Sequence, residues 1–275
     1  MTSIFIGLAV GLVLGLTGAG GSIFAVPLLM AVLGWSFTQA ATASLLAVAV
    51  AASVGTAMAW RHSYVRYRAA SLMAFVGLLL SPIGIQVANA LPESTLKIVY
   101  SLLLAVVSVR MYLMAVKSSE DTMIVRSAVS GEGYPSIGKV GRINPATGRL
   151  IWTRPVAMTV SCIGAVTGFL SGLLGVGGGF VIVPAIRAIL PLSMHSAVAT
   201  SLMAIALTST GTFIFALMQG RNVPFLVAFP FLIGTVFGMV LGRMLAPHIS
   251  GPTLQKAFAL LAMGVSIAMA TQAML

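Results

Sequence analysis

The chain has 275 residues, of which 59% are hydrophobic and only 7% are charged. A soluble domain carries about 25% charged residues, so this composition excludes one and predicts an all-α polytopic membrane protein. The formal net charge of +11 comes from cations gathered in loops. These cations lack the aromatic companions of a nucleic-acid surface, so the expected partner is the lipid bilayer and not nucleic acid.

The first four apolar segments cover about residues 3–34, 38–60, 69–91 and 95–116. Each is at least as long as the roughly 20 residues that cross a membrane. The first is interrupted at Thr17–Gly21, because interior glycine pairs end or bend a helix. The piece that follows, Ser22–Leu33, is too short at about 1.5 Å per residue to span a bilayer alone. We therefore expect a half-helix there.

Residues 117–154 form the one substantial hydrophilic loop, with six cations. Loop 61–68 adds Arg61, Arg66 and Arg68. An excess of cations marks cytoplasmic loops, so both loops are expected inside the cell. The stretch "KVGRINPATGRLIWT" has turn residues between alternating flanks, which favours a small β-hairpin. The loop is interpreted as a linker, with a cytoplasmic gate or a contact in a homodimer left open.

Four more apolar segments follow, at about residues 156–191, 195–219, 223–246 and 253–274. The first of these is interrupted at Gly175–Gly179, which leaves Phe180–Leu190 as a second half-helix. The two interrupted segments match each other. "GLTGAGGSIFAVPLL" and "GLLGVGGGFVIVPAI", 157 residues apart, are identical at seven of fifteen positions. The domains predicted are therefore a first transmembrane repeat (1–116), a linker (117–154) and a second repeat (155–275).

Two topologies remain open for these repeats. If each interrupted segment crosses the membrane once, the chain crosses eight times, the halves are parallel and Arg221 lies inside. If each is re-entrant, three crossings remain in each half and the halves are inverted. The inverted topology puts Arg187 and Arg243 inside and both termini outside, and we favour it.

The apolar segments hold no acidic residue, because all four acids lie in loops or at segment ends: Glu93, Glu120, Asp121 and Glu132. Cation and proton carriers commonly keep a carboxylate within the membrane, so a cation substrate is disfavoured. A helix that begins after a glycine turn instead presents N–H groups without partners and a partial positive charge. Such an end favours an anion. The repeated glycine cluster therefore predicts a two-part anion cradle, although glycines also permit close helix packing.

The residues expected at this cradle come from both halves. The backbone donors and the adjacent hydroxyl are Gly20, Gly21, Ser22, Gly177, Gly178 and Gly179. Hydroxyls of the following helices could bind an oxyanion, and two cations lie nearest the second interruption: Ser44, Thr200, Ser201, Arg187 and His195. The three histidines are scattered without the spacing of a metal site, and no catalytic motif or cofactor motif is found. A membrane enzyme is therefore disfavoured.

The paired glycine motifs are each followed by an Ala/Thr/Ser-rich helix, "ATASLLAV" and "VATSLMAI". In these features the chain resembles the sulfite exporter TauE/SafE family over nearly its whole length, apart from 117–154. The resemblance implies a carrier in the bacterial inner membrane for sulfite, thiosulfate or an organosulfonate such as sulfoacetate. The first half departs from the family's Thr-Ser pair, with Ala43-Ser44 against Thr200-Ser201.

The sequence thus leads to a secondary transporter that exports a small sulfur-containing anion by alternating access. Two alternatives remain at this point. One is an anion channel built on the same cradle, and the other is an importer or exchanger of thiosulfate or another small organic anion.

Overall fold

The computed structural model describes residues 2–18, 21–60, 65–127, 152–189, 194–221, 224–246 and 251–274, without the side chains of 114–127, 187–189, 194–195, 225–227, 251–255 and 274. This part of the chain contains ten helices and no strand. They are α1 (Thr2–Thr17), α2 (Ser22–Leu33), α3 (Phe37–Trp60), α4 (Tyr67–Ala90), α5 (Glu93–Ser127), α6 (Arg154–Leu174), α7 (Gly179–Ile189), α8 (Met194–Met218), α9 (Phe225–Leu245) and α10 (Gly251–Met274). The predicted all-α class is confirmed.

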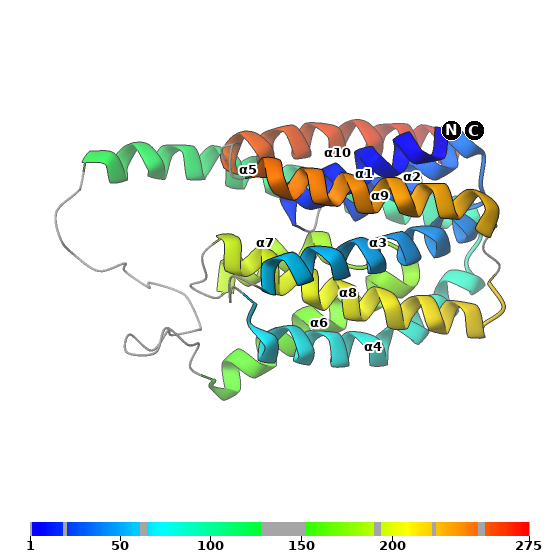
Figure 1. The fold of residues 1–275 in the computed structure, drawn as a ribbon, viewed down its shortest axis with the longest axis horizontal. Coiled ribbons are helices and arrows are strands. Elements are labelled where there is room, and N and C mark those ends of the chain that lie inside the picture. Colours follow the sequence, from blue (N-terminus) through cyan, green and yellow to red (C-terminus); the bar gives the residue numbers. More distant parts are fainter. Residues whose placement is uncertain are drawn as a thin grey trace.

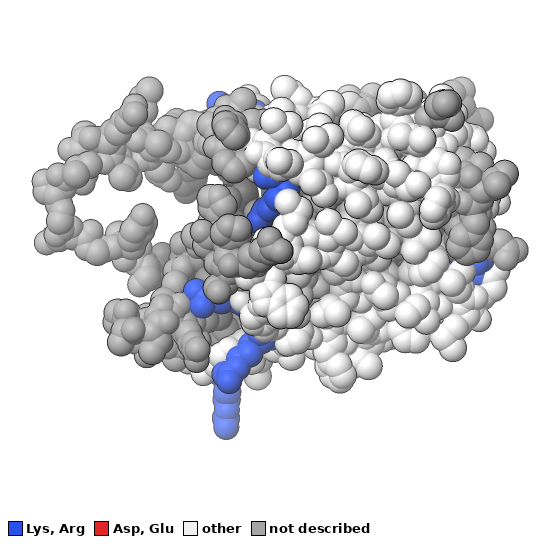
Figure 2. All heavy atoms as spheres, viewed as in Figure 1, with Lys and Arg blue, Asp and Glu red and all other residues white. Residues whose placement is uncertain are grey.

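Seven of the described helices are long and apolar enough to cross a membrane: α3, α4, α5, α6, α8, α9 and α10. Their outward faces carry large apolar side chains, and Phe75, Phe229 and Phe237 are each 63% exposed. Contiguous exposed apolar surface of this kind indicates contact with lipid or a partner. The visible surface in Figure 2 is almost free of Lys and Arg along the body of the bundle, and these side chains gather near one end. The chain is a multi-pass membrane protein.

Helices from the first part of the chain pack against helices from the second part in a single bundle (Figure 1). Helix α1 packs along α9, α4 along α6 and α5 along α10, while α3 and α8 pack against each other in the middle. Small residues allow these close approaches. A β-carbon on Gly168 of α6, for example, would collide with the backbone of Gly77 in α4. Each tight pair joins the first part of the chain to the second, so neither part forms a separate domain.

Both termini lie at one end of the bundle, and the end of α5 lies at the opposite end, with the start of α6 (Figure 1). Helix α5 continues to Ser127 and not only to the predicted segment end at 116. It contains no glycine or proline to stop it, and charged residues are good helix formers. The β-hairpin predicted within residues 139–153 falls almost wholly outside the described residues.

Candidate functional site

The first junction, between α1 and α2, begins at Gly18. Its positive φ of 76° ends α1, and its N–H donates to the carbonyl of Leu14 at 2.8 Å. Gly21 then caps α2 and packs against the backbone of Leu14 and Val10, where a β-carbon would collide. The N-cap is therefore Gly21 and not Ser22, which is the first helical residue and is fully buried.

Pro27 inside α2 leaves one carbonyl without its usual helical donor, because proline has no N–H. That carbonyl belongs to Ile23, four residues earlier. The buried hydroxyl of Tyr100, in α5, donates to it at 2.7 Å. Helix α5 thus stabilises the first turn of α2. The buried carbonyl of Ile23, which would be costly to leave unpaired, has a hydrogen-bond partner.

The second junction, between α6 and α7, repeats the same plan with more glycines. Gly175 ends α6 with φ 71°, and its N–H donates to Ser171 O at 2.9 Å. Gly177 and Gly178 follow with φ values of 71° and 67°, a backbone conformation that favours glycine. A β-carbon on Gly178 would press on Thr167 of α6. Helix α7 then begins at Gly179 with its N-terminus fully buried.

Serine hydroxyls from the opposite half hold both junctions. Ser44 of α3 donates to the carbonyl of Gly175 at 2.8 Å. Ser201 of α8 lies 3.3 Å from the carbonyl of Gly18 and 2.8 Å from that of Val198. Both hydroxyls, which the sequence suggested as donors to an anion, therefore face backbone carbonyls in this structure. In this structure the two hydroxyls stabilise, or brace, the backbone of the junctions through these hydrogen bonds.

Of the remaining predicted residues, the structure describes the side-chain contacts of Thr200. Thr200 donates to Ser196 O at 2.7 Å and accepts the N–H of Arg66 at 3.1 Å, so it ties α8 to the loop before α4. Gly20 lies outside the described residues. The side chains of Arg187 and His195, in α7 and α8, are also outside them.

Ser209 is a further buried polar residue beside the second junction, in a segment that the sequence marks as polar through Thr208, Ser209 and Thr210. It lies in α8, is fully buried, and its hydroxyl oxygen has no hydrogen-bond partner in the described structure. That oxygen faces Gly177, where a β-carbon would press on it. The same glycine lies against Val48 and Ile205, each the twelfth residue of its long helix. Ser209 and Gly177 therefore meet near the middle of the bundle.

The surroundings of the two junctions differ in polarity. Near the second junction, Ser171 lies 3.4 Å from Thr212 between their hydroxyl oxygens, and both side chains are buried. The offset of 157 residues that aligns the glycine motifs places Ala52, Leu14 and Gly55 where the second half has Ser209, Ser171 and Thr212. Only the second junction therefore has this set of buried hydroxyls around it.

A pocket of about 510 Å³ opens at the bundle end that carries the termini, where α3 and α5 begin and α4 and α8 end. We call it the outer pocket; its lining residues are Ser36, Phe37, Thr38, Gln39, Ala88, Asn89, Leu91, Glu93, Leu96, Gln219, Gly220 and Arg221. Glu93 accepts the N–H of Phe37 at 3.0 Å and lies 3.7 Å from Lys97. This carboxylate therefore accepts a hydrogen bond from the first turn of α3, where backbone N–H groups lack partners within the helix.

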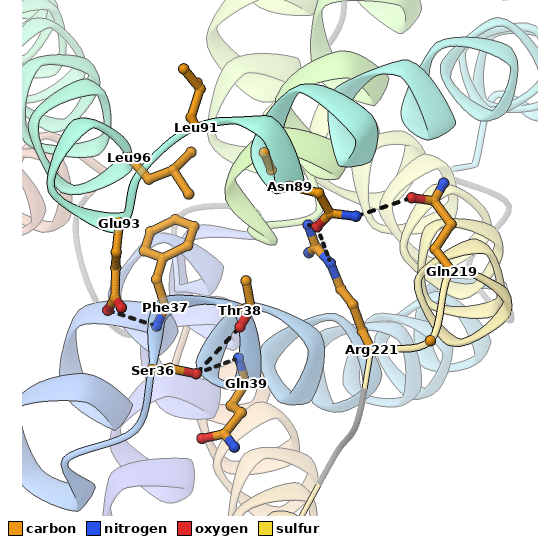
Figure 3. Close-up of a pocket in the computed structure, with 12 residues that line it drawn as sticks. Ser36, Phe37, Thr38, Gln39, Asn89, Leu91, Glu93, Leu96, Gln219 and Arg221 are labelled. Carbon is orange, nitrogen blue, oxygen red and sulfur yellow. Dashed lines mark hydrogen bonds between the residues drawn. The ribbon is translucent and has the colours of Figure 1, made fainter.

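Arg221 enters the outer pocket from the end of α8. Gly220, with φ 79°, reverses the backbone there, and the N–H of Arg221 donates to Ala216 O at 3.1 Å, which closes the helix end. Its guanidinium donates to Asn89 Oδ1 at 2.7 and 3.2 Å, and Asn89 Nδ2 donates to Gln219 Oε1 at 3.3 Å (Figure 3). Burial lowers the pKa of Arg221 from its usual value. This cluster was not predicted, because Asn89 lies at the end of one segment while Gln219 and Arg221 follow another.

Comparison with known proteins places these features in a family. The sequence profile of the family described as "Sulfite exporter TauE/SafE" matches residues 3–269. A "probable membrane transporter protein" of Xylella fastidiosa (strain 9a5c) is 30% identical over 267 residues, covering 94% of this chain and 90% of the relative.

The "probable membrane transporter protein YjnA" of Bacillus subtilis (strain 168) is 24% identical over 258 residues, covering 92% of each chain. No solved structure matches. Since the family profile covers almost the whole sequence, the chain belongs to the sulfite exporter TauE/SafE family of membrane transporters.

Proposed function

We propose that this transporter exports a small sulfur-containing anion, such as sulfite or the organosulfonate sulfoacetate, by alternating access. The observation that carries the proposal is the buried N-terminus of α7, because Gly177, two residues before it, lies against the unpartnered hydroxyl of Ser209 near mid-bundle. The N–H groups that begin a helix and a free hydroxyl are all donors. A buried set of donors without acid suits an anion.

In this proposal the anion site is centred on Gly177, Gly178, Gly179 and Ser209. Gly177 lies against Ser209 in the present structure with no room even for a β-carbon between them, so the site is closed and must open for the anion to enter. The braces from Ser44 and Ser201 keep the junctions in place while the surrounding helices move. Helix α2 contacts α7, and its N-terminus at Gly21 and Ser22 would contribute the other half of the cradle.

We further propose that the two halves are inverted repeats, each opening with a re-entrant hairpin. The inversion is supported by Figure 1, because α1 begins at the bundle end that carries the termini and α6 begins at the opposite end. Three matched relationships support the repeat itself. Gly21 packs on the α1 turn before it as Gly178 packs on α6, Ser201 faces Gly18 as Ser44 faces Gly175, and α1 pairs with α9 as α6 pairs with α4. An inverted repeat gives a carrier two equivalent ways to open.

The cations support an orientation in which the end without the termini is cytoplasmic. Arg66 and Arg68 precede and begin α4, Arg154 begins α6, and Arg243 ends α9. An excess of cations on one side marks the cytoplasm. The membrane potential, negative inside, would then drive an anion outward through the bundle toward the termini.

The test is purified protein in liposomes, with currents recorded after jumps of sulfite, thiosulfate, sulfoacetate, sulfate and chloride. We expect a saturable current with one or two sulfur anions and none with chloride. A current that rises linearly with concentration would indicate a channel. Absence of both current and radiolabelled flux for every sulfur anion, from folded protein, would refute the proposed substrate class.

A further inference from the structure

We propose that the outer pocket is a second anion site, in which Arg221 binds the charged group of a small organic anion on the exit side of the bundle. The binding follows from the pocket alone. Its place in an export path rests on the proposed function.

The first argument is the unpaired charge of Arg221. Its side chain is 8% exposed, and the acceptors that it meets, Asn89 Oδ1 and Ile85 O, are neutral. Among the described residues the one ion pair is Lys97–Glu93. A buried charge without a counter-ion is costly, and burial lowers the pKa of this guanidinium. An anion in the pocket would supply the missing charge.

The second argument is that the guanidinium is held in place before any ligand arrives. Asn89 accepts two N–H groups of Arg221 with one oxygen, and its own amide is fixed by Gln219. Figure 3 shows this chain of contacts at one side of the pocket. The terminal nitrogen Nη1 has no partner among the described residues. A guanidinium that is already oriented loses less freedom on binding an oxyanion.

The third argument is size and lining. A volume of about 510 Å³ lies in the range of about 300–1,000 Å³ that is usual for ligand pockets, and it exceeds what a bare inorganic oxyanion needs. Phe37 and Leu96 offer apolar walls, and Gln39 offers an amide. The pocket therefore suits a sulfonate or carboxylate attached to a short carbon chain.

The fourth argument is position. Phe37–Gln39 line the pocket, and Ala41, two residues further along α3, touches Gly175 at the second junction. On the other wall, Ala88 lies one turn beyond Gly84, which packs on the backbone of Phe169 and Leu173 near the end of α6. The outer pocket thus lies about one helical turn outside the α6–α7 junction, where an exported anion would emerge.

The experiment is a fluorescence titration of the full-length protein. Trp35 adjoins the pocket residue Ser36, whereas Trp60 lies at the far end of α3. With Trp60 and Trp152 replaced by Phe, Trp35 reports on the pocket while sulfoacetate, methanesulfonate or chloride is added. We expect a saturable change with sulfoacetate that Arg221→Gln weakens at least tenfold. The matched control, Arg68→Gln, removes an exposed cation at the start of α4, at the opposite end of the bundle, and should leave the affinity unchanged.

Asn89→Ala provides a second variant in case Arg221→Gln fails to fold. This variant keeps the charge of Arg221 but removes the side-chain oxygen that orients its guanidinium, and it should weaken anion binding several-fold. Equal affinities for wild type, Arg221→Gln and Asn89→Ala would overturn the proposal, as would the absence of a saturable change in the wild type. Liposome flux without pocket binding would leave the export proposal standing and this one refuted. Pocket binding without flux of any sulfur anion would refute the export proposal and leave this one standing.

Discussion

The hydroxyl of Ser44 in α3 donates a 2.8 Å hydrogen bond to the carbonyl of Gly175, at the end of α6. The two residues are 131 positions apart and both are buried. Ser201 and Gly18 repeat the relationship with the halves exchanged. Each junction is therefore fastened by the long central helix of the opposite half.

Ser44→Ala should destabilise the second junction. The change leaves the buried carbonyl of Gly175 without its donor, at a cost of about 1–3 kcal/mol. Thermal unfolding in detergent should show a lower Tm and liposome flux should fall. Ser53→Ala is the control, because that exposed hydroxyl bonds only to Ala49 within its own helix. Equal melting temperatures for the two variants would contradict the bracing role.

Tyr100→Phe should loosen α2. The carbonyl of Ile23 would lose its external donor, and Pro27 cannot replace it. We expect a loss of about 1–3 kcal/mol, read as a lower Tm. Tyr112→Phe in the same helix is the control, since that side chain is 47% exposed. A Tyr100→Phe protein as stable as the control would show that the bond contributes nothing.

Gly168→Ala should disrupt the pairing of α4 and α6, because its β-carbon would collide with the backbone of Gly77. The expected result is a large loss of folded protein on size-exclusion chromatography. Gly264→Ala in α10 meets nothing within 4 Å. It should be neutral or stabilising by up to about 1 kcal/mol, because alanine favours helix more than glycine does. Normal yield of the Gly168 variant would mean that the helices are less closely packed than described.

Ser209→Ala should weaken anion transport without lowering the stability of the protein. Removing an unpartnered buried hydroxyl costs the empty protein nothing and can stabilise it. A hydrogen bond to a charged ligand is worth about 1.5–3 kcal/mol, so KM for the anion should rise about tenfold or more.

The control for Ser209→Ala is Thr210→Ala, which removes an exposed hydroxyl bonded to Ala206. Its KM and Tm should both stay near the wild-type values. A Ser209→Ala protein with an unchanged KM would exclude Ser209 from the anion site, and one with a much lower Tm would indicate a structural hydroxyl.

Fusions at the two termini should report the same side of the membrane. We expect alkaline phosphatase to be active, and green fluorescent protein to be dark, when either is fused to the N- or C-terminus in bacterial cells. The reverse pattern is expected after insertion into the linker between α5 and α6. A fluorescent C-terminal fusion would contradict the inverted orientation.

Much of the fold follows from the sequence because hydropathy and glycine position are local signals. Apolar length predicted the long helices, and Gly18 and Gly175, which belong to the glycine motifs, have positive φ where α1 and α6 end. The end of α5 was missed because the loss of apolar character at residue 117 does not end a helix. Glycine and proline are the strongest local signals of a helix end, and neither occurs in α5 before Ser127.

The candidate site was less predictable, because it depends on which helices meet. The sequence could identify Ser44 and Ser201 as polar residues in apolar segments, but not that their hydroxyls face glycine carbonyls. The hydroxyls of Thr208 and Thr210 bond to carbonyls of their own helix, whereas that of Ser209 has no partner, a difference that packing decides. Arg221, Asn89 and Gln219 come together because α4 and α8 end at the same level.

The most direct test of the account is counterflow in liposomes that contain the purified protein. The vesicles are loaded with unlabelled sulfite or sulfoacetate, and uptake of the same anion labelled with ³⁵S is followed at zero membrane potential. The account predicts a transient accumulation of label above equilibrium, saturable and diminished in Ser209→Ala but not in Thr210→Ala. Uptake that only approaches equilibrium, unaffected by the internal anion, would contradict a carrier that works by alternating access.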